Sequence, residues 1–174
     1  MEHKVVTTNE ACPALLVPTG YPVTLPAGTF LKLTQASGRS FTVVFQGNMY
    51  WISGQHAALI GQLVDDIQFP QPQATHVVEE NIWHALRQVF DPEIPVNLAD
   101  LGLIYSVVIN NAQVDIAMTL TAPGCGMGPV LVQEVKDTVQ QVPGVEQVVV
   151  ELVFDPPWSR DMMTEEAQLE LGIF

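Results

Sequence analysis

A segment rich in proline and glutamine, residues 69–75, separates two stretches of sequence with different hydrophobic patterns. Before it, short apolar or alternating runs are cut by Gly and Pro, which is typical of small antiparallel β domains. After it, apolar residues recur at helical spacing or in longer alternating runs. Because proline favours extended backbone and is excluded from helix interiors, such a segment is typical of a linker. We therefore predict a β-rich domain over residues 1–67, a linker over 68–75 and a second domain over 76–174.

The first domain is predicted to be all β and barrel-like. Residues 1–12 contain no sustained pattern and are expected to form an irregular start, in which Cys12 has a structural role. Candidate strands follow at residues 22–25, 29–34, 40–45 and 49–52. The dipeptide Gly47-Asn48 predicts a hairpin between the last two, since both residue types tolerate positive φ.

The second domain is predicted to be a compact α/β unit, which makes the whole chain α+β. Thr75 can cap a first helix, and Pro92 ends it. The elements predicted after this helix are a β-hairpin at residues 104–109 and 114–120, a helix from 129, a strand at 147–154 and a short C-terminal helix from 164. Because a helix connects the second and third strands, these two strands should be parallel.

This connectivity brings three irregular segments to one edge of the predicted sheet. The second and third strands end there, and the loop of residues 91–102 leads into the antiparallel first strand at the same edge. Ligands bind preferentially at the carboxyl ends of strands in α/β sheets. The polar residues expected at this edge are Thr119, Thr121, Cys125, Asp91, Glu93, Asp100 and Asp155.

Cys125 is the candidate for chemistry, because it lies in a glycine-rich turn that leads into a helix. Free N–H groups and the helix dipole at such a position favour the thiolate, which is both nucleophile and metal ligand. Nearby carboxylates disfavour a thiolate that has no counter-ion, because like charges repel. A bound cation would stabilise both the thiolate and the carboxylates. One thiolate is too few for a closed zinc site or a four-thiolate cluster, so a metal would need ligands from a second subunit, a partner or a small thiol. The alternatives stay open: Cys125 as a small buried hydrophobe, and Asp91 or Asp155 as turn formers before proline.

A thiol hydrolase is the enzymatic alternative. It needs a histidine base near Cys125, and the second domain offers only His76 and His84. The spacing of His84 from Ile82 and Leu86 predicts a solvated helix position. The glycines around Cys125 lack the lysine and spacing of a phosphate-binding loop. We therefore expect a protein that is not an enzyme.

The net charge of −13 is concentrated after residue 64, which argues against binding to a nucleic-acid backbone. It suits metal ions or basic partner surfaces, or serves solubility alone. No apolar run reaches membrane-spanning length, and the first residues do not resemble a signal peptide. Two distant cysteines do not imply a disulfide framework. We expect a cytoplasmic protein that binds neither nucleic acid nor membranes.

Three motifs of the second domain, at residues 91–105, 119–125 and 155–167, resemble the metal–sulfur cluster assembly factor domain. Residues 16–28 and 47–49 resemble the N-terminal extension of bacterial SufT-type proteins. In this resemblance Cys125 corresponds to the family's motif cysteine, and Asp91 and Glu93 to its Asp-Pro-Glu segment. Many members have proline after the cysteine, where this chain has Gly126.

The resemblance implies an accessory, non-catalytic role in iron–sulfur cluster assembly or delivery. Cys125 would be the metal ligand, and Thr121, Asp91 and Glu93 would join it in contacting a transient cluster or iron, with nothing permanently bound. The implied partners are the iron–sulfur assembly machinery and apo client proteins, and a homodimer is possible. The alternatives are a metal-free interaction adaptor in the same pathway and, less favoured, a thiol-dependent enzyme.

Overall fold

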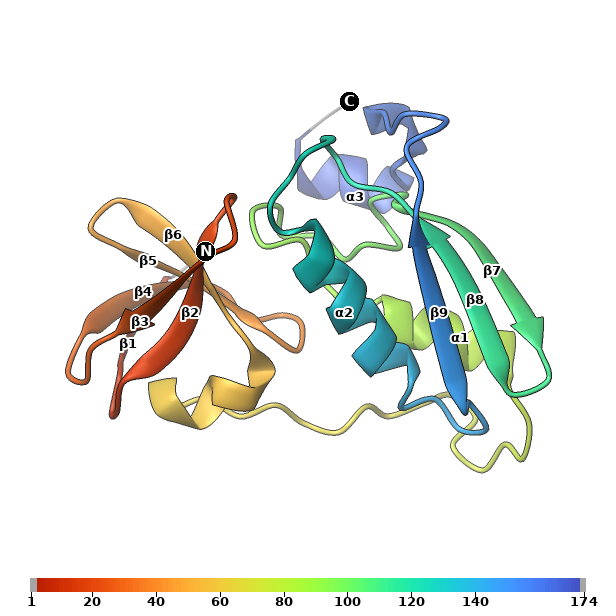
Figure 1. Ribbon diagram of the computed structural model, residues 1–174, viewed down its shortest axis with the longest axis horizontal. Coiled ribbons are helices and arrows are strands. Elements are labelled where there is room, and N and C mark those ends of the chain that lie inside the picture. The colour runs from red at the N-terminus through yellow and green to blue at the C-terminus, as the bar shows by residue number, and fades with distance from the viewer. Residues whose placement is uncertain (1–2, 173–174) are drawn as a thin grey trace. The chain divides into compact units, whose positions relative to one another are not determined.

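The computed structural model describes residues 3–172, and the chain divides into two compact units (Figure 1). The first unit comprises Met1–Asp66 with Pro92–Pro95, and the second comprises Ile67–Asp91 with Val96–Phe174. The elements of the first unit are β1 (Lys4–Thr7), β2 (Cys12–Val17), β3 (Tyr21–Leu25), β4 (Phe30–Gln35), β5 (Phe41–Phe45), β6 (Asn48–Ile52) and the 3-10 helix η1 (Gly54–Ile60).

The six strands of the first unit form one antiparallel sheet in the order β1-β4-β5-β6-β2-β3. This confirms the predicted all-β character. The prediction of an irregular start was wrong, because β1 pairs with β4 and its Val6 lies in the core. A strand of four residues is too short to leave a pattern, and its pairing partner follows more than twenty residues later.

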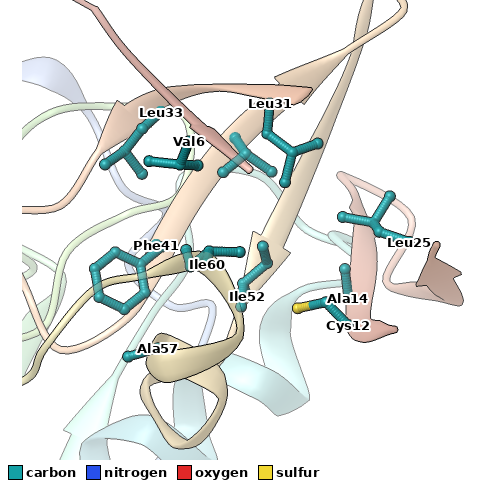
Figure 2. Close-up of a cluster of buried hydrophobic side chains, with 11 residues drawn as sticks. Val6, Cys12, Ala14, Leu25, Leu31, Leu33, Phe41, Ile52, Ala57 and Ile60 are labelled. Carbon is teal, nitrogen blue, oxygen red and sulfur yellow. The ribbon is translucent and has the colours of Figure 1, made fainter. Parts of the chain in front are cut away.

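The core of the first unit lies between one face of this sheet and η1. Figure 2 shows its side chains, with Ala57 and Ile60 of η1 near Phe41 and Ile52 of the sheet. Cys12 is fully buried in this core. Its environment agrees with the structural role predicted for it.

The β5–β6 hairpin turns one residue earlier than predicted. Phe45 pairs with Asn48, so the turn residues are Gln46 and Gly47. Both have positive φ, as tight two-residue turns of the mirror-image type require. Asn48 therefore belongs to the strand rather than to the turn.

The second unit contains two helices, a three-stranded sheet and a short C-terminal helix. Its elements are α1 (Glu79–Leu86), β7 (Ile104–Asn110), β8 (Gln113–Met118), α2 (Gly128–Val139), β9 (Gln147–Leu152), the 3-10 turn η2 (Arg160–Met162) and α3 (Glu165–Glu170). β7 is antiparallel to β8, and β9 is parallel to β8, which confirms the predicted arrangement and the α+β class. Within residues 3–172, every helix is too short or too polar to cross a bilayer.

The helices cover one face of the β7–β8–β9 sheet. Val114, Ile116 and Met118 point to that face and are buried, and α2 contacts both β9 and α1. On the opposite face Val108 and Val149 remain 48% and 40% exposed. The second unit is therefore a two-layer structure with one open sheet face.

The first helix begins later than predicted, because its N-cap residue is Val78 rather than Thr75. The chain before it is held by a side chain instead. Asn81 donates from Nδ2 to the carbonyl of Gln71 (2.9 Å) and accepts from the Gln71 N–H (3.0 Å). These paired bonds fasten part of the proline-rich segment to α1, so it is not a free linker at that point.

Candidate functional site

Cys125 lies partly exposed in the turn between β8 and α2, and residues 127 and 128, which follow in the sequence, are buried. Met127 is fully buried, and Gly128 is packed so closely that an added Cβ would come within 2.9 Å of Leu120 Cδ1. Gly124 has a φ of 79°, which lets the chain reverse just before the cysteine. The turn is thus anchored after Cys125, while the Cys125 side chain itself stays partly exposed.

The loop before β7 is built on leucines and a local asparagine turn. Leu98, Leu101 and Leu103 are fully buried. Asn97 accepts from the Asp100 N–H (2.9 Å) and donates from Nδ2 to the Asp100 carboxylate (2.8 Å). Asp100 therefore shapes this turn, which is the structural alternative to metal binding.

The end of β8 joins this loop through the backbone. The Thr119 N–H donates to the Leu103 carbonyl at 2.8 Å, and the Val153 N–H after β9 donates to the Met118 carbonyl at 2.8 Å. Figure 1 shows β8 and β9 pointing to the same edge, with α3 beside it. The three segments predicted to converge are therefore neighbours at this edge.

The C-terminal tail closes the edge with three hydrogen bonds to the region before and within β7. Tyr105 donates its hydroxyl to the Pro156 carbonyl (2.7 Å), and Trp158 Nε1 donates to the Leu101 carbonyl (2.7 Å). The Thr164 N–H donates to the Asp100 carbonyl (2.9 Å). These contacts join residues more than fifty positions apart, so no local sequence pattern announces them.

One polar atom at this edge lacks a partner within the described chain. The Thr119 hydroxyl is buried, its residue is 1% exposed, and it makes no hydrogen bond within residues 3–172. Buried hydroxyls are almost always paired, so this one marks a site where an acceptor or a water molecule would be stabilised.

The predicted site residues differ in accessibility. Cys125 and Thr121 are partly exposed, Glu93 is exposed, and Asp91 is buried. Within residues 3–172, no three or more His, Cys, Asp or Glu side chains are grouped to hold one metal ion. A metal bound through Cys125 would therefore need ligands from outside this chain, as one thiolate implies.

His84, the histidine considered as a base, packs against an aromatic ring. Its imidazole lies edge-on to Phe69, with the ring centroids 6.1 Å apart. Its side chain is intermediate in exposure, so it remains partly solvated.

The two cysteines should differ strongly in reactivity. Burial raises the pKa of the Cys12 thiol and hides it from solvent, whereas Cys125 is partly exposed. We expect iodoacetamide to modify Cys125 in the folded protein more than about tenfold faster than Cys12, because thiolate content and access both control the rate. Mass spectrometry of the two cysteine peptides measures this, and urea-unfolded protein is the control in which the rates should converge. Equal rates in the folded protein would contradict the burial of Cys12.

The second unit is similar to proteins with a known family assignment. The family model described as iron-sulfur cluster assembly protein matches residues 79–152. A Porphyromonas gingivalis protein named Fe-S protein maturation auxiliary factor is 50% identical over 95 residues, which cover 54% of this chain and 90% of the relative. The Staphylococcus aureus Fe-S protein maturation auxiliary factor SufT is 38% identical over 49% of this chain and 98% of its own length.

A solved structure shares the same fold. The crystal structure of a domain of unknown function from Bacillus anthracis matches with a TM-score of 0.52 and 38% identity. The match covers 55% of this chain and 92% of that chain. About half of this chain thus corresponds to nearly the whole of each of these proteins.

Proposed function

We propose a function on the premise that this chain belongs to the iron–sulfur cluster assembly protein family, as its match to the family model and its 50% identity to a maturation factor show. The chain is an accessory factor in the assembly or delivery of iron–sulfur clusters, of the SufT type. The relatives' names describe auxiliary factors, so we propose a role that involves no catalysis by the chain itself.

In this proposal the Cys125 thiolate contacts iron or a cluster in transit. The observation that carries it is the position of Cys125, partly exposed in the turn between β8 and α2 beside the edge where three segments meet. Thr121, Asp91 and Glu93 are proposed to flank the cargo. Iron and clusters bind thiolates, and a site with one thiolate releases its cargo more readily than a closed site with four.

The remaining ligands would come from the protein or small thiol that gives or receives the cluster. We propose the iron–sulfur assembly machinery and apo client proteins as partners, in the cytoplasm, with a second copy of the chain as a possible ligand donor. Within residues 3–172, no three metal-binding side chains are grouped together. We therefore expect iron or a cluster to bind this chain weakly unless a partner supplies further ligands.

A metal-free adaptor is the second candidate, and the open sheet face favours it. Val108 and Val149 are exposed on either side of Asp115 in the register of β7, β8 and β9. Apolar groups on an exposed sheet face are suited to contact a partner protein. In this case Cys125 would be dispensable.

The proposal is tested in a strain that lacks this chain. Loss of the chain should lower the activity of iron–sulfur enzymes but not of enzymes without clusters, and the wild-type chain should restore it. Unchanged iron–sulfur enzyme activity in that strain would contradict an accessory role. Cys125→Ser should fail to restore activity if the thiolate contacts the cargo, whereas full restoration would favour the adaptor.

A further inference from the structure

The first unit contains a pocket of about 410 Å³ over β2, β3 and β6. Leu15 pairs with Pro22 on one side and with Trp51 on the other, so these three side chains lie in one row. Their neighbours Ala14 and Ile52 are buried in the core, and side chains alternate along a strand. Leu15 and Trp51 therefore point away from the core and into the pocket that they line.

The walls of this pocket are mostly apolar. Pro13 and Pro22 contribute rigid rings, Trp51 an indole and Leu15 an aliphatic side chain. Polar groups come from Thr24, Ser53 and His56. Of the described residues that line it, none is Asp, Glu, Lys or Arg. The volume lies within the range of about 300–1,000 Å³ that is usual for small-molecule sites. Such walls suit a flat ring without a strong charge.

The Trp51 side chain that lines the pocket also carries an unpaired donor. The indole Nε1 of Trp51 is buried and meets no acceptor within residues 3–172. Buried tryptophan N–H groups usually have a partner, because an unsatisfied buried donor costs about 1–3 kcal/mol. An acceptor atom on a molecule in the pocket would remove this cost if the indole ring turned to bring Nε1 to the pocket surface.

We propose that this pocket binds a small, flat ring compound that carries a hydrogen-bond acceptor and no strong charge. The acceptor pairs with Trp51 Nε1, and the ring packs on the indole and proline surfaces. This site lies in the part of the chain that the family match at residues 79–152 leaves out, so it stands independently of the role of Cys125.

Quinoline and naphthalene test the proposal, because they have nearly the same shape and only quinoline has an acceptor nitrogen. Each is titrated into the full-length protein while ¹⁵N–¹H spectra follow the indole N–H signals, with that of Trp51 assigned by its loss in Trp51→Phe. We expect a saturable shift of the Trp51 signal by quinoline. Quinoline should bind about fivefold more tightly than naphthalene, as one net hydrogen bond predicts.

Two variants and a control locate the site. Leu15→Trp should fill the pocket and remove saturable binding. Trp51→Phe should make quinoline and naphthalene bind with equal affinity. Because this variant lacks the Trp51 indole signal, its binding is followed by the backbone amide signal of Leu15. Val5→Trp is the matched control, because Val5 is exposed on β1 at the opposite edge of the sheet from β3, and it should leave binding unchanged. The absence of a saturable Trp51 shift, equal affinities in the wild type, or binding retained in folded Leu15→Trp would each overturn the proposal.

Discussion

Replacing Gly102 with alanine is expected to lower the free energy of unfolding of the second unit by about 3–5 kcal/mol. Gly102 has a φ of 77°, which alone costs an L-residue about 1–2 kcal/mol. A Cβ at this position would also lie 2.3 Å from the Met162 carbonyl oxygen and 2.8 Å from its carbon. These are backbone atoms, so the C-terminal tail must move away.

Movement of the tail would break contacts to the two residues that precede Gly102. The Leu101 carbonyl accepts from Trp158, and the Asp100 carbonyl accepts from Thr164. Each lost hydrogen bond costs about 1 kcal/mol, which adds to the backbone term. Gly102 therefore permits the close approach on which the closed edge of the sheet depends.

Gly124→Ala is the matched control for the steric part of this effect. Gly124 has nearly the same φ, 79°, but an added Cβ there would meet nothing within 4 Å. We expect Gly124→Ala to cost only about 1–2 kcal/mol. Urea unfolding of both variants in a Trp51→Phe background makes tryptophan fluorescence report on the second unit, where Trp83 and Trp158 lie. A cost for Gly102→Ala no greater than that for Gly124→Ala would contradict the close approach.

The contacts around Gly102 also show which parts of the structure the sequence could predict. The parallel pairing of β8 and β9 follows from their helical connection, and it places the ends of both strands at one edge. Alternation in β8 and helical spacing in α2 are local signals, and both elements form where these signals predict. Strand order alone was therefore enough to predict that the three segments meet.

The unpredicted features depend on partners that are distant in sequence. β1 exists because β4 pairs with it, and the bonds of Trp158 and Tyr105 to the backbone join positions 57 and 51 residues apart. Tyr105 and Trp158 belong to the sequence motifs that resemble the family. The residues next to them do not indicate, however, which backbone carbonyl accepts a hydrogen bond from each side chain. Accessibility was also beyond the sequence, since Asp91 is buried and Glu93, two residues later, is exposed.

Anaerobic incubation with iron and sulfide is expected to load the wild-type chain with iron, and Cys125→Ala should reduce bound iron and cluster absorbance to the background of the assay. The physical reason is that Cys125 is the one partly exposed thiol, and thiolates are the ligands that hold iron–sulfur clusters. Because no three metal-binding side chains are grouped within residues 3–172, a small thiol in the buffer must complete the coordination. Loading of the wild type should accordingly depend on the thiol concentration.

Cys12→Ala is the control for Cys125→Ala, because it also removes one thiol but leaves Cys125 in place. Cys12 is fully buried in the core of the first unit, so its truncation should lower stability by about 1 kcal/mol and leave iron loading unchanged. Circular dichroism should show that both variants are folded, since Cys125 lies in an exposed turn whose buried anchor is Met127. Iron content and absorbance that are equal in the wild type and Cys125→Ala would remove Cys125 as the ligand. A wild type that binds no iron at any thiol concentration, combined with full rescue by Cys125→Ser in cells, would instead identify the chain as a metal-free adaptor.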